Sequence, residues 1–334
     1  MLGLLTRAAL LLGTSAALLT TGVVAVDDAH TLPVFFFHGL TANATFGRNL
    51  KANLSTEARP LVTLNFCENE CSFSDLNNQS KLAIAQIRGI IANDTRFSRG
   101  YSFIAGNGVF YGPQANDFIP AQTFLRQFSP FIKEPDYTKY TDADISSGRL
   151  AIDQVKWQSA NPDKPSQLTR SPAKSDWIRY NTLFPKLNNL AVPASKEIIA
   201  DQSRRKNNFL RLKEAHYFGS EFDETIAPWQ STLNGQYEDI ASLAELETKY
   251  KTLKVWSMTE TPEYKQDLYG LQTLDKRGGL FLHQLDHVSH ECWVQDFMSP
   301  RDKQICQHKP VFERSVYPLL APVNAQGPPV QPHC

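Results

Sequence analysis

Two residues that follow strand-like apolar runs could form an acid–base pair. Asp223 comes shortly after the run 215–218, and His290 comes shortly after the run 279–285. A carboxylate can orient a histidine and stabilise its imidazolium, and a histidine held in this way can take a proton from a hydroxyl group at neutral pH. The two residues therefore predict a hydrolase that works through a nucleophile. No metal ion or other cofactor is needed for such chemistry, and we expect none.

Each member of this pair has an alternative. His287 lies three residues before His290 and could serve as the base in its place. Either histidine could also be purely structural. Asp223 could be a turn-forming residue on the surface, because aspartate is common in turns.

The nucleophile that the pair would serve has no motif of its own. The sequence contains no G-x-S-x-G, the sharp strand-to-helix turn that presents the serine in many α/β hydrolases. The strand-like run 102–105 leads directly into Gly106-Asn107-Gly108. Asn107 cannot accept an acyl group in this role. We therefore expect an acid and a base without the serine that should follow Ala105.

A tight turn after the first strand could stabilise an oxyanion. Residues 33–40 read Pro-Val-Phe-Phe-Phe-His-Gly-Leu, an apolar strand that runs into His38-Gly39. In a hydrolase, the backbone N–H of Leu40 would then point at the developing negative charge. A His-Gly pair can occur in any tight strand-to-helix turn, so this signal is weak alone.

Alternating strands and helices would have to position these residues. The strand-like runs are 34–37, 61–66, 102–105, 215–218 and 279–285. Between the second and third runs, residues 80–91 have helical apolar spacing, with Ser80 as the expected N-cap. Buried strands that alternate with helices predict an α/β fold with a doubly wound, mostly parallel sheet.

A long polar segment interrupts this pattern. Residues 113–205 are rich in Pro, Asp, Lys and Ser and have no regular strand spacing, which predicts a cap inserted into the 31–320 domain. The proline-rich tail 321–334 is predicted to be disordered. With 34 basic and 34 acidic residues and no basic block, the chain gives no reason to expect a nucleic-acid partner. The oligomeric state has no signature in the sequence.

The first 25 residues predict a secretory signal peptide. Arg7 precedes an apolar stretch, and Val23-Val24-Ala25 is a small-residue site after which cleavage is expected. A membrane helix is the alternative, but Gly, Ser and Thr dilute the apolar run, and we expect no transmembrane span elsewhere. Four Asn-x-Ser/Thr sequons fit a glycosylated, secretory protein: Asn43, Asn53, Asn78 and Asn93.

The five cysteines fit the same oxidising route. Cys67 and Cys71 are close enough in sequence to pair, and so are Cys292 and Cys306, which leaves Cys334 over. Sequence alone does not fix the connectivity. A metal site is the alternative, but there is no C-x₂-C and little paired histidine spacing to support it.

Five segments carry a resemblance to a known family, and they are 33–40, 206–210, 223–231, 264–280 and 287–293. Together they resemble the palmitoyl-protein thioesterase family, lysosomal α/β hydrolases that remove fatty-acyl groups from cysteine thioesters. The resemblance covers about 32–105 and 205–320. It leans towards the second subtype, in which a Ser-His pair stands three residues before Trp, and this favours His290 over His287 as the base.

The resemblance implies an α/β-hydrolase fold, fatty-acyl thioesters or S-acylated peptides as substrates, and a lysosomal or secreted location. It also implies a serine elbow, a helix and a further core strand after Ala105, which is about 25–35 residues that this chain lacks. Two explanations stay open. The chain is either a truncated form of an active thioesterase or a pseudoenzyme that binds acylated or lipid ligands without cleaving them.

Overall fold

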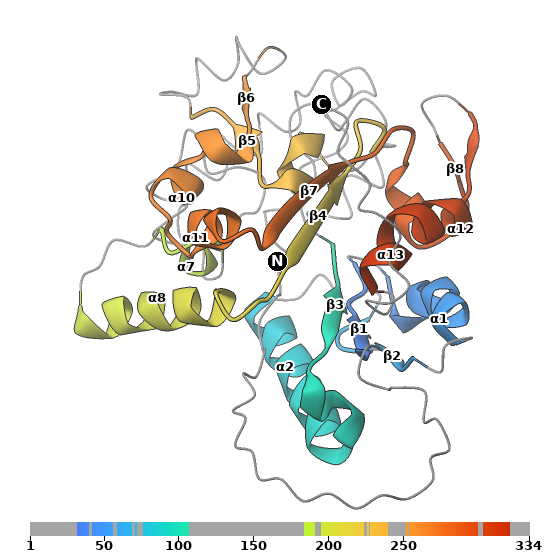
Figure 1. Ribbon diagram of the computed structural model, residues 1–334, viewed down its shortest axis with the longest axis horizontal. Coiled ribbons are helices and arrows are strands. Elements are labelled where there is room, and N and C mark those ends of the chain that lie inside the picture. Colours follow the sequence, from blue (N-terminus) through green and yellow to red (C-terminus); the bar gives the residue numbers. More distant parts are fainter. Residues whose placement is uncertain are drawn as a thin grey trace, which may run out of the picture.

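The structure is a computed structural model with a mixed α/β architecture and small parallel sheets (Figure 1). It describes residues 32–39, 42–55, 59–68, 71, 76–106, 184–190, 195–223, 226, 228–239, 252, 254–299 and 303–320. The expected signal peptide (1–25), most of the expected cap (113–205) and the expected disordered tail (321–334) lie outside these residues.

The first sheet contains three parallel strands in the order β2-β1-β3. They are β1 (Val34–Phe36), β2 (Leu61–Thr63) and β3 (Ser102–Ile104). In register, Val34 of the central strand pairs with Leu61 on one side and Ser102 on the other. All of β1 is buried, as expected for an uninterrupted apolar strand that is covered on both faces.

Alternate residues of β1 face two different layers. Phe35 packs in a cluster with Leu64, Ala83 and Ile87, whereas Phe36 packs in a cluster with Leu50, Leu54 and Phe312. This separation follows from the two-residue repeat of a strand. In Figure 1, α2 (Leu76–Asn93) lies on one side of β1 and β3, and α1 (Arg48–Ser55) lies on the other. Two short 3₁₀ helices, Ala44–Gly47 and Thr95–Arg99, complete this half.

The helix predicted at 80–91 is longer than expected, and Ser80 is not its N-cap. The helix begins at Leu76, so Ser80 lies inside it. The reason is visible in its buried face, where Gln79, Ala83 and Ile87 are 6%, 0% and 4% exposed. These residues follow the i, i+4 spacing of one helix face. Because this face already begins at position 79, the helix needs backbone upstream of Ser80.

The second sheet pairs β4 (Ala215–Gly219) with β7 (Leu280–Gln284) in parallel, with Ala215 opposite Leu280. The helices around it are α7 (Phe184–Leu187), α8 (Lys196–Phe209), α10 (Pro262–Lys265) and α11 (Leu271–Lys276). Leu280 of β7 forms a buried cluster with Met258, Leu271 and Leu274. Helix α8 is continuous across position 205, where the sequence places the end of the cap.

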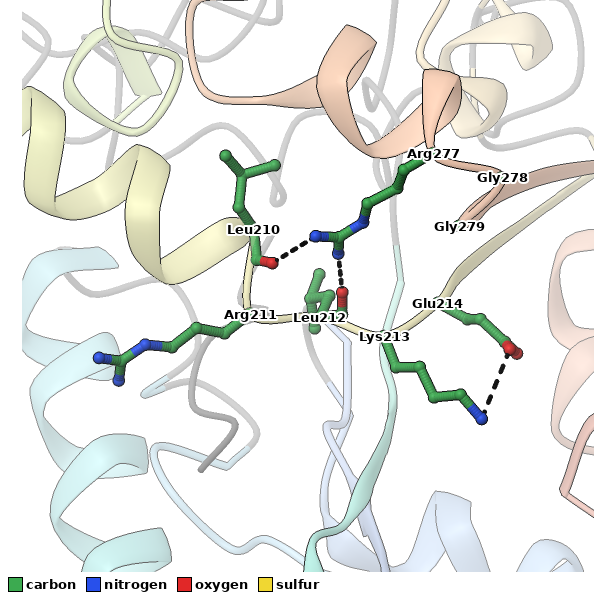
Figure 2. Close-up of a pocket in the computed structure, with 8 residues that line it drawn as sticks. All are labelled: Leu210, Arg211, Leu212, Lys213, Glu214, Arg277, Gly278 and Gly279. Carbon is green, nitrogen blue, oxygen red and sulfur yellow. Dashed lines mark hydrogen bonds and ion pairs between the residues drawn. The ribbon is translucent and has the colours of Figure 1, made fainter. Parts of the chain in front are cut away.

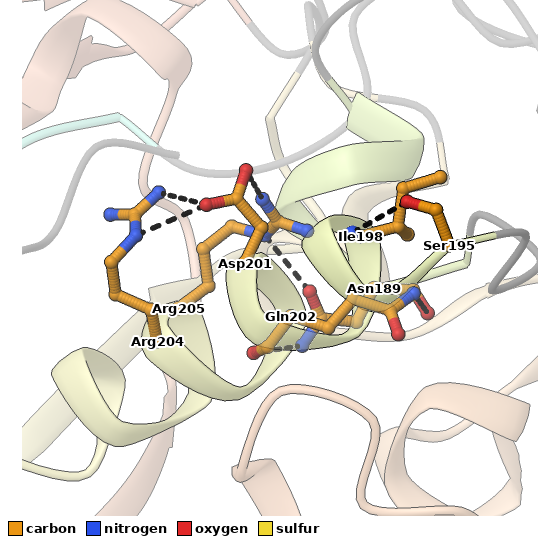
Figure 3. A network of polar contacts seen from close by, with 7 residues as sticks. All are labelled: Asn189, Ser195, Ile198, Asp201, Gln202, Arg204 and Arg205. Carbon is orange, nitrogen blue, oxygen red and sulfur yellow. Dashed lines mark hydrogen bonds and ion pairs between the residues drawn. The ribbon is translucent and has the colours of Figure 1, made fainter.

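A polar network fastens α8 to the segments beside it (Figure 3). Asn189 is 8% exposed, and its Nδ2 donates to the carbonyl oxygens of Gln202 at 3.1 Å and Leu268 at 2.8 Å. Arg205 Nε donates to Asn189 Oδ1 at 3.0 Å. Ser195 caps the helix, because its side chain accepts from the backbone N–H of Ile198. The start of the β4 strand is therefore held by a well-anchored helix.

The remaining elements are short. They are the 3₁₀ helices Trp229–Leu233, Met258–Glu260 and His290–Trp293 (η9); the antiparallel pairs β5 (Gln236–Tyr237) with β6 (Val255–Trp256) and β8 (Phe297–Met298) with β9 (Ile305–Cys306); and α12 (His308–Val311), the π-helix Phe312–Val316 and α13 (Tyr317–Leu320).

The five predicted strands all form, but not as one sheet. Within the described ranges, the two parallel sheets are separate, and no strand pairs with the outer edge of β3 or of β4. The single doubly wound sheet stays a prediction.

Two histidines on the neighbouring strands β4 and β7 contact each other on one face of the second sheet. His216 Nδ1 lies 3.0 Å from His283 Nε2. The His216 ring stacks on Phe281 at 4.6 Å, and the His283 ring stacks on Phe218 at the same distance. Burial lowers the pKa of His216 below 6.5, although Glu214 opposes the shift. Burial also lowers the pKa of His283, and the charge of His216 adds to this effect.

This pair should make the fold less stable in acid. A histidine whose pKa is lower in the folded chain binds protons more tightly when unfolded, so its stabilising effect is complete above the unfolded pKa and is lost as pH falls through the folded pKa. We expect the urea midpoint to decrease between pH 7.5 and pH 5. The double variant His216→Phe/His283→Phe should show a smaller decrease, with the remainder due in part to His308, whose pKa burial also lowers. Equal decreases in both proteins would contradict this assignment.

Candidate active site

The acid candidate lies in a turn just beyond β4. The backbone N–H of Asp223 donates to the carbonyl oxygen of Ser220 at 3.2 Å, which closes the turn. Asp223 Oδ1 accepts from the N–H of Ile226 at 2.8 Å. Only 3% of the Asp223 side chain is exposed. The carboxylate is therefore buried, and a backbone donor fixes one of its oxygens.

The base candidate lies within reach of the other oxygen. His290 begins η9, and its Nδ1 is 3.0 Å from Asp223 Oδ2. Because a carboxylate can only accept, Nδ1 carries the proton and donates it, which makes Nε2 the basic nitrogen of the neutral ring. The His290 side chain is 28% exposed. This is the geometry of an oriented imidazole that solvent can approach.

His287 lies elsewhere. It is exposed, its φ is 57°, and its ring packs against Phe222 with 4.0 Å between ring centroids. Of the two histidines that the sequence leaves in competition, His290 is the one with a carboxylate contact to Asp223.

The segment around His290 is fastened at several points. Cys292 is fully buried and forms a disulfide with Cys306 of β9. The Nδ2 of Asn49 in α1 donates to the carbonyl oxygen of Val294 at 2.9 Å. His308 Nδ1 lies 3.2 Å from the carbonyl oxygen of Cys292. The segment that carries His290 is thereby joined to α1, which packs beside the first sheet, and to α12 near the C-terminus.

Both expected disulfides are present, since Cys67 is bonded to Cys71 as well. The structure therefore confirms the two pairs that the sequence favoured.

The His-Gly turn is held by its histidine. His38 is 8% exposed, its Nε2 donates to the carbonyl oxygen of Phe66 at 2.7 Å, and its ring stacks on that of Phe66. These contacts give His38 a role in shaping the turn after β1. Leu40, the expected oxyanion donor, lies outside the described residues, so its role stays a prediction.

The serine nucleophile is expected directly after Ala105, where the sequence has Gly106. β3 ends at Ile104, Ala105 and Gly106 are exposed, and residues 107–183 lie outside the described part of the chain. Ser102 is the first residue of β3, so it lies at the opposite end of the strand from the expected nucleophile position. The expected absence of an elbow serine stays a prediction drawn from the sequence.

The sequons differ in accessibility. Asn93 is exposed, and its Nδ2 donates to the carbonyl oxygen of Gly89 at 2.8 Å. The Asn43 side chain accepts from the N–H of Thr45 at 2.9 Å at the start of a 3₁₀ helix. Asn53 Nδ2 is buried, which disfavours a glycan there. The side chain of Asn78 lies outside the described residues. Glycosylation stays a prediction at all four positions.

A cavity of about 460 Å³ lies at the opposite end of the second sheet (Figure 2). Its lining includes residues that precede β4 and β7, and Arg277 donates there to the carbonyl oxygens of Leu210 and Leu212. In Figure 2, Arg211 points away from this group, and Lys213 pairs with Glu214. The cationic side chains that line this cavity are exposed or hydrogen-bonded to backbone carbonyl groups, so we assign no ligand to the cavity.

The described part of the chain has neither a metal-binding cluster nor a membrane-spanning helix. No three His, Cys, Asp or Glu side chains there gather in a way that could hold a metal ion. No helix there is long and apolar enough to cross a membrane.

Ser220 lies at this site, but no sequence motif predicts a role for it. Ser220 is 1% exposed, and its hydroxyl oxygen accepts from the N–H groups of Phe222 and Val288. A buried serine after a strand fits no motif, and the contact with Val288 joins positions 68 residues apart. Only the tertiary structure identifies it.

Comparison with known proteins gives a family match. A family model described as palmitoyl protein thioesterase matches residues 107–290. This match includes the stretch 113–205, which the resemblance read from the sequence does not cover. It ends at His290 and contains Asp223.

Curated relatives match over shorter stretches. Lysosomal thioesterase PPT2-B of Xenopus laevis is 32% identical over 117 residues, which are 35% of this chain and 34% of that protein. Lysosomal thioesterase PPT2 of Rattus norvegicus is 33% identical over 88 residues, which are 26% of this chain and 25% of that protein. Lysosomal thioesterase PPT2 homolog of Drosophila melanogaster is 24% identical over 123 residues, or 36% of each. The chain thus spans only 25% to 36% of the length of these relatives.

Proposed function

Because this chain belongs to the palmitoyl protein thioesterase family, we propose that Asp223 and His290 are the acid and the base of an acyl-thioester hydrolase site. One observation carries the proposal, which is the 3.0 Å contact between His290 Nδ1 and the buried Asp223 carboxylate. This contact sets the tautomer that leaves Nε2 basic. The α/β-hydrolase fold of the family is part of the same proposal.

In this function, His290 would take the proton of a nucleophile that attacks the thioester carbonyl and would later return a proton to the leaving sulfur. Asp223 would stabilise the imidazolium that forms in between. The backbone N–H of Leu40 would bind the oxyanion. The substrates would be fatty-acyl thioesters of cysteine, free or in S-acylated peptides.

The location that fits this function is the secretory pathway, with the lysosome or the cell exterior as the destination. Three observations support it: curated relatives are named lysosomal thioesterases, the chain has two disulfides, and residues 1–25 read as a signal peptide. The four sequons agree with this route.

The chain as written should not carry out the serine-dependent reaction. It has no G-x-S-x-G motif, and an acid and a base without a nucleophile can only activate water. We expect no stoichiometric labelling when the purified protein is treated with a fluorophosphonate serine probe. A serine hydrolase of known activity, treated in parallel, controls for the reagent. Labelling of one serine per chain would contradict the proposed loss of the nucleophile.

A second function is favoured by the same missing motif, namely binding of acylated ligands without cleavage. Its test is titration with a fluorescent peptide that carries a palmitoyl thioether, which no thioesterase can hydrolyse. Saturable binding that is blocked by an unlabelled palmitoyl peptide, but not by the same peptide without its acyl chain, would support it. Binding that does not depend on the acyl chain would contradict it.

A further inference from the structure

We propose that Ser220 is a positioning residue that holds the acid loop and the base loop in one fixed arrangement. This inference rests on the proposed acid and base roles of Asp223 and His290. It assigns no direct chemistry to Ser220, because the serine is buried and its oxygen is already used by backbone donors.

The Ser220 hydroxyl oxygen contacts both loops at once. It accepts from the N–H of Phe222 in the acid loop at 3.1 Å and from the N–H of Val288 in the base loop at 3.2 Å. A hydroxyl oxygen has two lone pairs, so one atom can serve both donors. Ser220 and Val288 are 1% and 3% exposed, which keeps water from replacing either bond.

The Ser220–Val288 hydrogen bond lies just beyond the point where the strands β4 and β7 separate. The ladder between β4 and β7 is extended by the bond from the N–H of Leu285 to the carbonyl oxygen of Gly219, at 2.9 Å. Beyond it the two strands lead into separate loops. The Ser220–Val288 bond lies between this end of the ladder and the Asp223–His290 contact.

A short ring of residues results. Ser220 lies three positions before Asp223, and Val288 lies two positions before His290. The ring is closed at one end by the Ser220–Val288 bond and at the other by the Asp223–His290 bond. Acid–base pairs act over about 2.6–3.2 Å, and functional geometry has to be held to about 0.5 Å. A shift of either loop would therefore break the contact that orients the base.

Loss of the hydroxyl would leave two backbone N–H groups without their acceptor. Buried N–H groups are rarely left unpaired, so the base loop would move to find another acceptor. Such a movement would disturb the hydrogen bond between His290 and Asp223. A change at His290 therefore distinguishes a positioning role from a general loss of stability.

The first test uses the protein without any substitution. Amide hydrogen exchange should show the Val288 N–H protected to a degree similar to amides of the β4–β7 ladder, because its acceptor is buried. The amide of Asp286, in the exposed part of the same loop, is the internal reference. Exchange of Val288 as fast as that of Asp286 would overturn the proposal.

The second test compares Ser220→Ala with the matched control Ser257→Ala. The Ser257 hydroxyl donates a hydrogen bond to Glu260 at 3.0 Å in a different part of the fold. Ser257→Ala therefore removes a hydroxyl hydrogen bond that lies away from the site. The readout is the imidazole Hδ1 signal of His290 in ¹⁵N-histidine-labelled protein, assigned by its loss in His290→Gln. We expect Hδ1 exchange with water to accelerate about five- to tenfold in Ser220→Ala, as for loss of one hydrogen bond, and to stay unchanged in Ser257→Ala.

A third variant, Ser220→Cys, keeps a side-chain heteroatom at this position that is larger than the hydroxyl oxygen and a weaker acceptor, and it addresses folding failure of the alanine variant. It should also accelerate Hδ1 exchange. Unchanged exchange in a folded Ser220→Ala or Ser220→Cys protein would overturn the positioning role while leaving the acid–base pair intact. If the unsubstituted protein shows no His290 Hδ1 signal, while Val288 is protected, the acid–base pair itself fails. The two failures are thus distinguishable.

Discussion

Insertion of a serine elbow, helix and strand after Ala105 is expected to produce a protein that hydrolyses a palmitoyl thioester and reacts with a fluorophosphonate probe. The chain as written should do neither. The reason is that the proposed acid and base already lie at hydrogen-bonding distance, with 3.0 Å between His290 Nδ1 and Asp223 Oδ2, and the inserted segment would supply the serine that the sequence is expected to lack. The segment would come from a member of the family, and turnover would be measured by release of free thiol.

Substitutions in this restored protein test the assigned roles. His290→Gln should lower kcat by about 10⁶-fold and Asp223→Asn by about 10⁴-fold, because the members of such a triad act as a unit. His287→Gln is the matched control and should retain activity, since its ring packs on Phe222. A restored, folded protein that labels with the probe but loses its activity through His287 rather than His290 would show that the base is misassigned. An insertion variant with a serine-to-alanine change at the elbow controls for turnover that does not depend on serine.

Replacement of Phe35 by alanine is expected to lower the free energy of unfolding by about 3–5 kcal/mol, the range for removal of a buried phenylalanine. Phe35 is fully buried in the central strand of the first sheet. Its ring contacts those of Phe97, Tyr101 and Phe103, with centroids 4.9, 5.4 and 5.8 Å away. Domains of this kind are stable by only about 5–15 kcal/mol, so the change removes a large share of the total.

Urea unfolding followed by tryptophan fluorescence would measure this loss. Leu82→Ala is the matched control, because Leu82 lies in α2, which supplies Ala83 and Ile87 to the same cluster, but is itself 51% exposed. Exposed substitutions of this kind usually change stability by no more than about 0.5 kcal/mol. Equal effects of the two substitutions would mean that Phe35 does not lie at the centre of the packed layer.

Local patterns in the sequence predicted the elements and part of the site. Apolar runs indicate strands because a buried strand needs uninterrupted apolar side chains, and each of the five runs contains a strand in the structure. The loops after parallel strands meet at one edge of a sheet, and for this reason the sequence predicts Asp223 and His290 as a pair. The start of α2 was misplaced, because a capping serine is a weaker signal than the buried face at Gln79, Ala83 and Ile87.

The amino-acid sequence by itself located the strands and the acid and base candidates and favoured the two disulfide pairs, because each depends on residue types at short or family-typical spacing, and the structure then showed the pairs. The family resemblance favoured His290 over His287, but only the tertiary structure showed that His290 contacts Asp223. It alone also showed that His216 stacks with His283 and that Ser220 joins the two loops. These contacts link residues 67 or 68 positions apart. The physical reason is that such contacts depend on the register of β4 against β7, and register follows from the packing of the whole sheet rather than from neighbouring residues.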